Sequence, residues 1–389
     1  MTLSRRHFMD IMISGILLQS CKKDFKNMPI LSGLDCLHHD HADGAITNLE
    51  KIPEYYRLSG MEMPAQIRDF RNLGDLRQKV VAWYTNPQID MPTKFGLLTN
   101  VLQNPDTLFL FGYQYVKVRA GQGVRYCEAT FAPQYHVRGD NKSKAALTEK
   151  EVVDAFLAGT TAAEKDYPQI EANALVTIGR EIVDPEHPEW GGIPRAKKII
   201  DIIAEGDRSR LVGVGLVSDE AAYPPEMHVE IFNYANERGI PVDAHAGEWA
   251  NLPGQDPNSP KVIAKLMQNM RTAVYTLKIK RGSHFRLLSR DKELCKYMID
   301  NNIGVSSCPG SYLYSGLIKD VRELELDVLL DMGLLVSLHP DDDLFMDDIN
   351  KVFWDCLKAY NFTPFQVKQL RRNAWLTRFG NRKEHKIPA

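Results

Sequence analysis

The sequence has almost no charge imbalance, because 48 lysines and arginines are balanced by 50 aspartates and glutamates, for a formal net charge of −2. Such a chain offers no electrostatic reason to expect nucleic acid or an anionic membrane surface as its partner. It also contains no apolar run long enough to span a bilayer. Its 389 residues suffice for one large barrel or two medium domains, so we expect a globular protein.

Several catalytic motifs are missing as well. Zinc deaminases that act on cytosine combine HxE with PCxxC, but His187-Pro188-Glu189 has no CxxC partner anywhere in this chain. The sequence contains no HExxH, no P-loop and no GxSxG. The metalloprotease, kinase and serine hydrolase classes therefore have no support.

Cysteine is scarce, with six residues in total. An odd number remains once Cys21 is set aside, and three of the remaining five lie in strand-like runs. We therefore expect buried free thiols and no disulfide framework. The five are Cys36, Cys127, Cys295, Cys308 and Cys356.

The first 21 residues differ from the rest of the chain. Arg5-Arg6 precede an apolar run from Ile11 to Leu18, and Leu18-Gln19-Ser20-Cys21 is similar to a lipobox. This arrangement resembles a twin-arginine export signal. We expect residues 1–21 to direct export to a periplasmic or lipid-anchored location, with Cys21 as the candidate lipid attachment site and residues 22–30 as a tether. The alternative is a frayed N-terminal helix on a cytoplasmic protein.

Short apolar runs alternate with longer amphipathic ones over residues 31–389. This alternation predicts a single domain, a parallel (β/α)8 TIM barrel. The long gap at residues 44–124 contains helical patterns at Asp75–Tyr84 and Thr107–Arg119, and predicts a helical insertion after the first strand. Such an insertion falls on the carboxyl-terminal face of the barrel, where active sites lie.

The predicted strands are Leu34–His39, Arg125–Phe131, Ala174–Arg180, Leu211–Val217, Pro241–Ala246, Lys278–His284, Ile303–Cys308 and Gly333–His339. The predicted helices after the insertion are Glu149–Asp166, Pro194–Ala204, Pro225–Arg238, Pro260–Thr276, Ser289–Asn301, Val321–Met332, Phe345–Tyr360 and Thr363–Phe379.

Histidines and carboxylates gather at the ends of four predicted strands. They are His39 and His41 after the first strand, His245 and Glu248 after the fifth, His284 after the sixth, and His339 with Asp341–Asp343 after the eighth. Residues i and i+2 of a strand share a face, so two imidazoles can reach one ion. Singly, each residue would be an ordinary core or loop side chain. A barrel brings its strand ends to one cavity, however, and such a crowded cluster is costly without a bound cation.

At these residues the chain resembles the adenosine deaminases of the amidohydrolase superfamily, over nearly all of residues 31–379. The shared motifs are HDHADGA (His39–Ala45), RYCEATFAP (Arg125–Pro133), HAGE (His245–Glu248), CPGSYL (Cys308–Leu313), SLHPDDD (Ser337–Asp343) and RNAW (Arg372–Trp375). The HxHxDG opening and HAGE, in this order, are highly specific. His339 stands where the family usually has asparagine, and Phe285 where it has the glycine after the sixth-strand histidine.

The resemblance implies a site with one zinc ion per chain. The implied zinc ligands are His39, His41, His245 and Asp341. The implied catalytic residues are His284, which orients and deprotonates the attacking water, Glu248, which protonates purine N1, and Asp342, which hydrogen-bonds N7. The implied substrate contacts are His41, Asp342, Asp43 at the ribose 5′-hydroxyl, and Ser218, which replaces a glycine whose N–H meets purine N3.

We therefore expect zinc-dependent hydrolytic deamination of adenosine, and of 2′-deoxyadenosine, to inosine products and ammonia. Adenine deaminases typically carry glutamate where this chain has Asp43, and the shorter carboxylate leaves space for ribose. An adenine deaminase and a deaminase of a modified 6-aminopurine nucleoside remain the alternatives. A non-catalytic purine-nucleoside-binding barrel is disfavoured, because neither a metal ligand nor Glu248 is lost.

Overall fold

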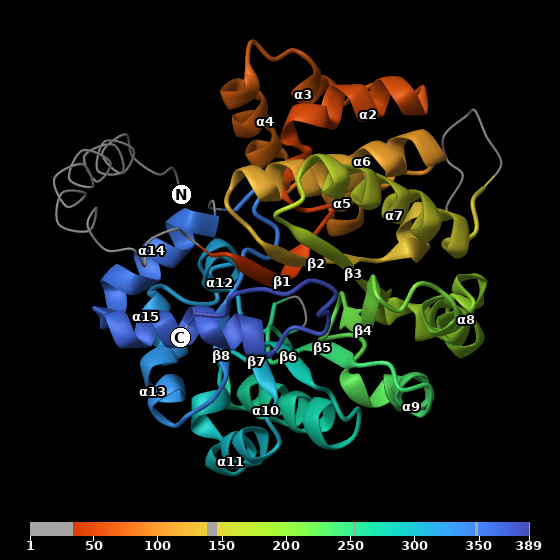
Figure 1. Ribbon diagram of the computed structural model, residues 1–389. Helices are drawn as coiled ribbons and strands as arrows, with labels where there is room; N and C mark the ends of the chain where they lie inside the picture. The colour runs from red at the N-terminus through yellow and green to blue at the C-terminus, as the bar shows by residue number, and fades with distance from the viewer. Residues whose placement is uncertain (1–33, 138–145, 252–253, 347–348, 389) are drawn as a thin grey trace, which may run out of the picture. The chain divides into compact units, whose positions relative to one another are not determined.

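Eight parallel strands form the centre of the protein (Figure 1). The computed structural model describes residues 34–137, 146–251, 254–346 and 349–388. The predicted export signal, Cys21 and the tether at residues 22–30 lie outside these ranges. The strands are β1 (Cys36–His41), β2 (Tyr126–Phe131), β3 (Glu171–Gly179), β4 (Leu211–Val217), β5 (Val242–Ala246), β6 (Arg281–His284), β7 (Gly304–Ser307) and β8 (Val336–Leu338).

Each strand pairs in parallel with the next one along the chain. An isolated parallel bridge between Asp40 and Asp341 joins β1 to the chain that follows β8. Nearly all strand residues are buried, because side chains fill the inside of such a barrel and helices cover its outside. The predicted TIM barrel is confirmed.

Helices follow the strands and cover the barrel. They are α7 (Glu149–Asp166), α8 (Gly192–Glu205), α9 (Val229–Glu237), α10 (Pro260–Tyr275), α11 (Lys292–Asp300), α12 (Pro309–Tyr314), α13 (Leu326–Asp331), α14 (Ile349–Tyr360) and α15 (Pro364–Leu376). The α7 bounds match the prediction, because Thr148 and Glu151 form a capping box that defines its start.

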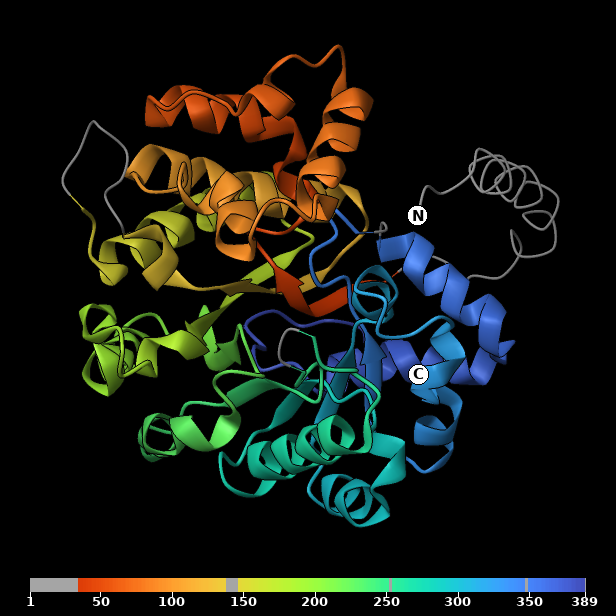
Figure 2. The same cartoon turned by 180° about the vertical axis from the view of Figure 1, so that it is seen from behind.

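The predicted insertion between β1 and β2 is present. It contains α2 (Ile52–Ser59), α3 (Ala65–Arg68), α4 (Leu73–Thr85), α5 (Met91–Thr99) and α6 (Pro105–Gly121). Figures 1 and 2 show these helices, coloured red to orange, together on one side of the barrel. Tyr84 of α4 stacks on Phe345 after β8, with ring centroids 3.9 Å apart, so α4 reaches the ends of the strands.

Three strands illustrate how the observed bounds depart from the predicted ones. The first is predicted at Leu34–His39 but runs to His41, and its register with β2 shifts between Leu37 and Asp40. The sixth begins only at Arg281, because Lys278 has a left-handed φ of 57° that no strand accommodates. The eighth is reduced to Val336–Leu338. An apolar run therefore indicates that a segment is buried, but the strand within it can be shorter than the run.

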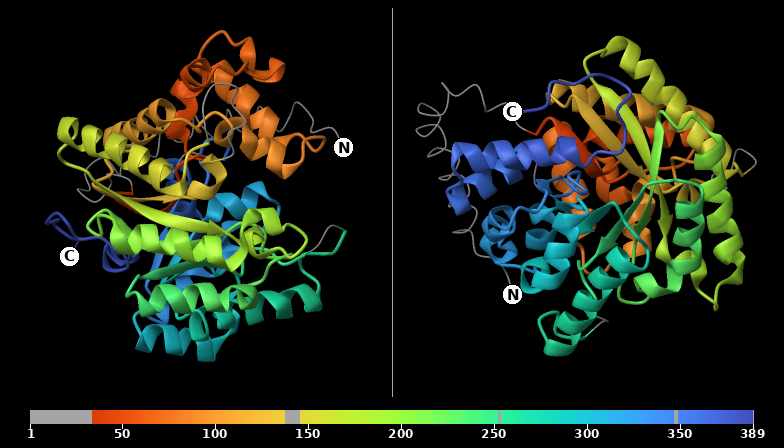
Figure 3. Two further views of the ribbon diagram at one scale, coloured as in Figure 1. Left: turned by 90° about the vertical axis from the view of Figure 1, so that its right-hand side faces the viewer. Right: turned by 60° about the horizontal axis from the view of Figure 1, so that its bottom comes forward.

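The chain after α15 lies against the amino-terminal ends of the first strands (Figure 3). The Arg382 N–H donates to Glu171 at the start of β3, 3.0 Å away, and the Phe379 N–H donates to Glu128 of β2, 2.5 Å away. The Arg281 guanidinium lies 4.1 Å from the centre of the Phe379 ring. This segment closes the end of the barrel opposite the strand ends that carry the histidines.

Two further expectations concern the described residues. The five cysteines there are all buried and free, which confirms the absence of a disulfide framework among them. Within the same residues, no helix combines the length and apolar character needed to cross a membrane.

Candidate metal-dependent active site

Four side chains from different parts of the barrel bring one ligand atom each into a small space. They are His39 and His41 of β1, His245 of β5 and Asp341 after β8, and their ligand atoms all lie within 4.8 Å of one another. The Nε2 atoms of His39 and His41 each lie 3.4 Å from Oδ1 of Asp341. The Nε2 atoms of His41 and His245 are 3.1 Å apart. The structure thus brings together the four ligands that the resemblance implies.

The extended backbone of β1 explains how two of these residues come together. His39 and His41 are two positions apart and both reach Asp341, as strand alternation requires. Asp40, between them, contacts Arg119 and Tyr115 of α6 instead. The alternation of side chains along β1 therefore directs the two histidines toward the candidate metal site and the Asp40 carboxylate toward α6.

The donor set fits a metal ion. Both ring nitrogens of His39, and Nδ1 of His245, are buried without a hydrogen-bond partner among the described residues. Burial, with His39, His284 and His41 nearby, lowers the pKa of His245 and keeps its imidazole neutral. Burying unpartnered polar nitrogens is costly, and coordination to a cation would satisfy one nitrogen of each ring. Three imidazoles and one carboxylate are ligands of the kind found at catalytic metal centres.

The ligand carboxylate is held in its charged form. Burial by itself would raise the pKa of Asp341, but the neighbouring His39 outweighs burial and holds that pKa below its usual range. An ionised carboxylate is the form that binds a cation.

Two more predicted residues, His284 and Glu248, lie beside this cluster. Nε2 of His284 lies 3.3 Å from Oε2 of Glu248 and 4.0 Å from Oδ2 of Asp341. Burial, followed by Asp341 and Glu220, raises the pKa of Glu248 well above its usual value. Burial and His39 lower the pKa of His284. A carboxyl that retains its proton thus lies next to a neutral imidazole, a pairing suited to acid–base chemistry.

Asp342 is a second carboxyl with a raised pKa. Burial is the main cause, followed by Asp341, Asp43 and Glu248. Its Oδ1 is buried and has no hydrogen-bond partner among the described residues. A Cβ at Gly44 would come within 1.5 Å of this oxygen, so only glycine leaves room for it. Asp342 is therefore poised to donate a hydrogen bond to a ligand.

Asp43 lies near His41 and Asp342 of the same cluster. Its Oδ2 is 4.0 Å from Nε2 of His136, and burial raises its pKa. The pKa of Tyr84 is raised by burial and then by Asp342 and Asp43, which places this phenol of α4 close to both carboxyls. Sequence reasoning did not single out Tyr84.

The backbone is strained where four strands end. Positive φ angles occur at Ser218 (85°), His284 (77°), Phe285 (54°) and Asp341 (60°), and at Gly247 (68°). Non-glycine residues in this region cost free energy and cluster at functional sites. The Phe285 ring packs over Gly282, where a Cβ would meet it at 2.2 Å. The Ser218 hydroxyl lies next to the phenol of Tyr135.

Two buried residues missed by sequence reasoning hold the HAGE turn. Glu220 accepts hydrogen bonds from the N–H groups of Gly247 at 2.8 Å and Glu248 at 3.0 Å. Arg180 donates to the carbonyl oxygen of His245. Glu220 lies two positions after Ser218. A carboxylate in the turn after the fourth strand is therefore the sequence feature that could have indicated this role.

His339 is also a strand-end histidine, but its side chain is not among the candidate metal ligands. Its Nε2 lies 2.8 Å from the hydroxyl of Ser337, and its Nδ1 accepts from the His38 N–H at 3.3 Å. The rings of His38 and His339 are 4.0 Å apart. This pair forms a layer next to the metal cluster, with Ser306 and Thr377 bonded to His38.

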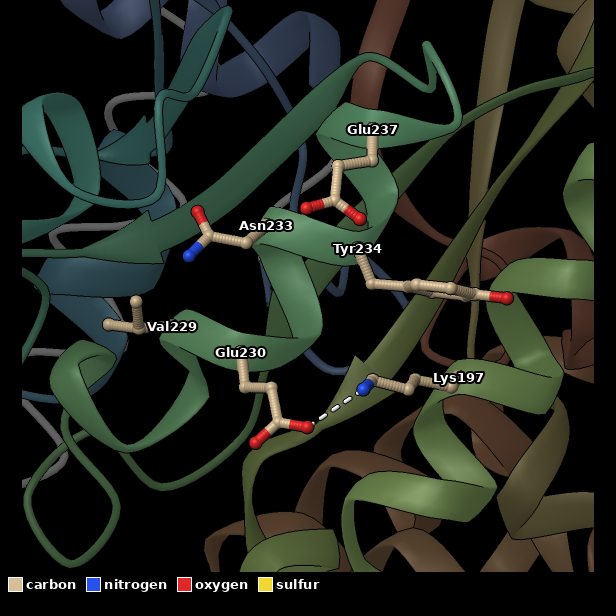
Figure 4. Close-up of a pocket in the computed structure, with 6 residues that line it drawn as sticks. All are labelled: Lys197, Val229, Glu230, Asn233, Tyr234 and Glu237. Carbon is tan, nitrogen blue, oxygen red and sulfur yellow. Dashed lines mark hydrogen bonds and ion pairs between the residues drawn. The ribbon is translucent and has the colours of Figure 1, made fainter.

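A hollow of about 460 Å³ lies elsewhere, between α8 and α9 (Figure 4). Lys197 and Glu230 form an ion pair of 2.7 Å across it. It contains none of the predicted site residues, so it is not part of the candidate active site. Its lining residues are Lys197, Val229, Glu230, Asn233, Tyr234 and Glu237.

Known structures share the architecture described above. An adenine deaminase from Arthrobacter aurescens matches with a TM-score of 0.69 and 20% identity, over 90% of this chain and 94% of the other. A zinc-bound amidohydrolase from Burkholderia ambifaria matches with a TM-score of 0.70 and 20% identity, over 90% and 87%. An N6-methyl-AMP deaminase from Arabidopsis thaliana matches with a TM-score of 0.68 and 16% identity, over 90% and 94%. At these identities, the likeness establishes the fold.

Sequence relatives extend over most of the chain. An adenosine deaminase of Shewanella denitrificans is 26% identical over 337 residues, which are 86% of this chain and 91% of the relative. An adenine deaminase of Schizosaccharomyces pombe is 24% identical over 369 residues, 92% and 91% respectively. The family model described as adenosine deaminase matches residues 35–387. The metal-binding geometry and this match agree, and the chain belongs to the adenosine deaminase family.

Proposed function

We propose that the protein is a zinc-dependent enzyme that converts adenosine and 2′-deoxyadenosine, with water, into the inosine products and ammonia. The observation that carries this proposal is the buried cluster that combines His39, His41, His245 and Asp341 with two carboxyls of raised pKa, Glu248 and Asp342. The zinc bound by the Burkholderia ambifaria amidohydrolase and the names of the curated relatives support it.

His39, His41, His245 and Asp341 would hold one zinc ion per chain. When bound, the ion supplies Lewis acidity, which lowers the pKa of water toward neutrality and makes a nucleophile available. His284, neutral because its pKa is lowered, accepts the proton of the attacking water.

Glu248 supplies the proton that the ring requires. As water adds to C6, the purine must take up electron density, and N1 must gain a proton. Burial raises the pKa of Glu248 and so favours its protonated form, which can donate to N1. Its carboxyl lies 3.3 Å from His284, so the accepting and donating groups are adjacent.

Asp342 and Asp43 recognise the purine nucleoside. N7 of a purine is a hydrogen-bond acceptor, so Asp342 must be protonated to bind it, and its raised pKa keeps it so. Asp43, the shorter acid in the HxHxDG opening, leaves room for ribose and accepts from the 5′-hydroxyl. His41 and Ser218 line the same substrate space.

The main alternative is the free base, which the name of the Schizosaccharomyces pombe relative favours. A 5′-nucleotide is disfavoured by charge, because its phosphate would meet the Asp43 carboxyl that the nucleoside would contact through its 5′-hydroxyl. The nucleoside avoids that repulsion while using Asp43.

A substrate panel with metal analysis on the same sample tests the proposal. We expect ammonia release from adenosine and 2′-deoxyadenosine to exceed ammonia release from adenine, AMP and guanine, and to exceed methylamine release from N6-methyl-AMP. Asp43→Glu should weaken nucleoside turnover more than adenine turnover. Faster turnover of adenine by the unmodified protein would favour the alternative. Release of neither ammonia nor methylamine from any substrate with metal-replete protein would favour a binding role.

We also propose that residues 1–21 direct export, with a lipid at Cys21, on the basis of Arg5-Arg6 and the lipobox-like segment. Cell fractionation of the full chain and of Cys21→Ala tests this. We expect the unaltered chain with the membrane fraction and the variant in the soluble exported fraction. A cytoplasmic location for both would contradict export.

A further inference from the structure

The barrel closes between β1 and the chain after β8, and this closure has few hydrogen bonds. The β2–β3 pair runs in register over six residue pairs, whereas Asp40 and Asp341 form only an isolated bridge. The closure shows two backbone hydrogen bonds, from His41 to Asp341 and from Asp341 to His39, each 3.2 Å long. Three of the four candidate metal ligands are therefore the residues of a weakly paired junction.

Arg119 of α6 bridges the same junction with its side chain. Its Nε and Nη2 donate to the two oxygens of Asp40 at 2.8 and 2.6 Å. Its Nη1 and Nη2 donate to the two oxygens of Asp343 at 2.9 and 3.1 Å. Asp40 lies between His39 and His41, and Asp343 lies two positions after Asp341. One guanidinium thus holds both segments that carry these ligands.

The hydrogen bonding around Arg119 is complete. The fifth guanidinium N–H donates to Gln122 at 2.9 Å, so all five donors of the group are used. Tyr115 donates to Asp40, and the Ile46 N–H donates to Asp343, each at 2.6 Å. The side chains of Arg119, Asp40 and Asp343 are fully buried.

Stability alone is a poor reason for this arrangement. Buried ion pairs repay their desolvation cost only with excellent geometry, and apolar replacements are often as stable. A planar guanidinium group that hydrogen-bonds to two carboxylates does, however, fix the distance between them. Residues that orient metal ligands affect metal binding itself.

We propose that Arg119 is a positioning residue for the metal centre, which sets the separation of His39 and His41 from Asp341 by holding Asp40 and Asp343 across the barrel closure. This role rests on the proposed metal centre and not on which purine is the substrate. It operates in the protein without substrate, so metal binding alone reports it.

The test compares zinc affinity in the full chain, measured by competition with a chromophoric chelator, for Arg119→Met, Arg119→Lys and the unmodified protein. We expect a loss of affinity of about 10-fold or more for Arg119→Met. Arg119→Lys keeps the positive charge but loses the planar guanidinium. Its zinc affinity should therefore lie between that of Arg119→Met and that of the unmodified protein. The visible spectrum of the cobalt-substituted variants should change as the ligand geometry changes.

Arg210→Met is the matched control. Arg210 pairs with Glu164 at 2.7 Å, both side chains being mostly buried, and neither residue neighbours a candidate ligand. The Arg210→Met protein should be less stable than the unmodified protein but should have the same zinc affinity and the same cobalt spectrum.

Wild-type zinc affinity and an unchanged cobalt spectrum in a folded Arg119→Met or Arg119→Lys protein would overturn the proposal. If Arg119→Met does not fold, Arg119→Lys and Asp343→Asn decide the question by the same measurements. A protein that loses zinc in these variants but deaminates no purine would contradict the proposed function while supporting the role of Arg119.

Discussion

At the scale of single residues, the proposed mechanism depends on the proton carried by Glu248. Glu248→Gln preserves shape but removes the transferable proton. We expect kcat to fall about 10²- to 10⁴-fold, the usual contribution of general acid catalysis, with zinc content unchanged. Steady-state kinetics with metal analysis on the same sample checks both. Glu230→Gln, at an exposed glutamate in the α8–α9 hollow, is the control and should behave as the unmodified protein. Normal kcat in Glu248→Gln would remove Glu248 as the proton donor.

Ser218 offers a second test at this scale, because its φ of 85° is unfavourable for any residue with a Cβ. Ser218→Gly should raise the free energy of unfolding by about 1 kcal/mol, less whatever the lost hydroxyl contributes at Tyr135. Ser218→Ala separates these effects, because it removes the hydroxyl and keeps the strain. Urea unfolding of the three proteins measures the differences. A less stable Ser218→Gly would mean that the hydroxyl outweighs the strain.

At the scale of elements, α6 and α7 approach each other through two glycines. A Cβ at Gly112 would lie 2.3 Å from the Phe156 carbonyl oxygen, and one at Gly159 would lie 2.0 Å from that of Phe109. This close contact holds α6, which carries Arg119, against its neighbour.

Gly112→Ala and Gly159→Ala should therefore separate the helices and lower the free energy of unfolding by about 1–3 kcal/mol. Gly121→Ala is the matched control. It lies in the same helix as Gly112, and a Cβ there would have no neighbouring atom within 4 Å, so it should be neutral or stabilising by up to about 1 kcal/mol. Denaturant unfolding measures all three, and equal effects at Gly112 and Gly121 would contradict the close contact.

The sequence predicted elements well where local chemistry defines them. The bounds of β4 and α7 match, because an apolar strand and a capping box are local patterns. The HxH spacing and the strand-end rule also named side chains that the structure brings together. No local pattern could predict that Arg119 meets Asp40 and Asp343, since these contacts span 79 and 224 positions of sequence and depend on how the barrel closes.

At the scale of the whole molecule, buried histidines make stability depend on pH. Burial lowers the pKa of His228 from 6.5 to about 4, against hydrogen bonds to carbonyl oxygens that raise it. The unfolded chain therefore binds the proton more readily. The contribution of His228 is fully present above pH 6.5 and is lost as pH falls toward 4, with a size of about 3 kcal/mol at most.

His228→Gln should reduce this acid sensitivity. We expect the difference in unfolding free energy between the variant and the unmodified protein to change across the interval from pH 7 to pH 4, in favour of the variant at the acid end. Urea unfolding at several pH values measures it, and taking the difference cancels any shared effect of metal loss. A difference that stays constant with pH would show that His228 does not titrate in this range.

The wide separation of the ligands along the chain has a consequence for biosynthesis. His39 is translated long before Asp341 and Asp343. A nascent chain cannot bring the three histidines and Asp341 together, or engage Arg119 from both sides, until Asp343 has left the ribosome. An ion held by all four candidate ligands would bind only after that point, and any route that exported the protein with such an ion in place would have to accept a folded barrel.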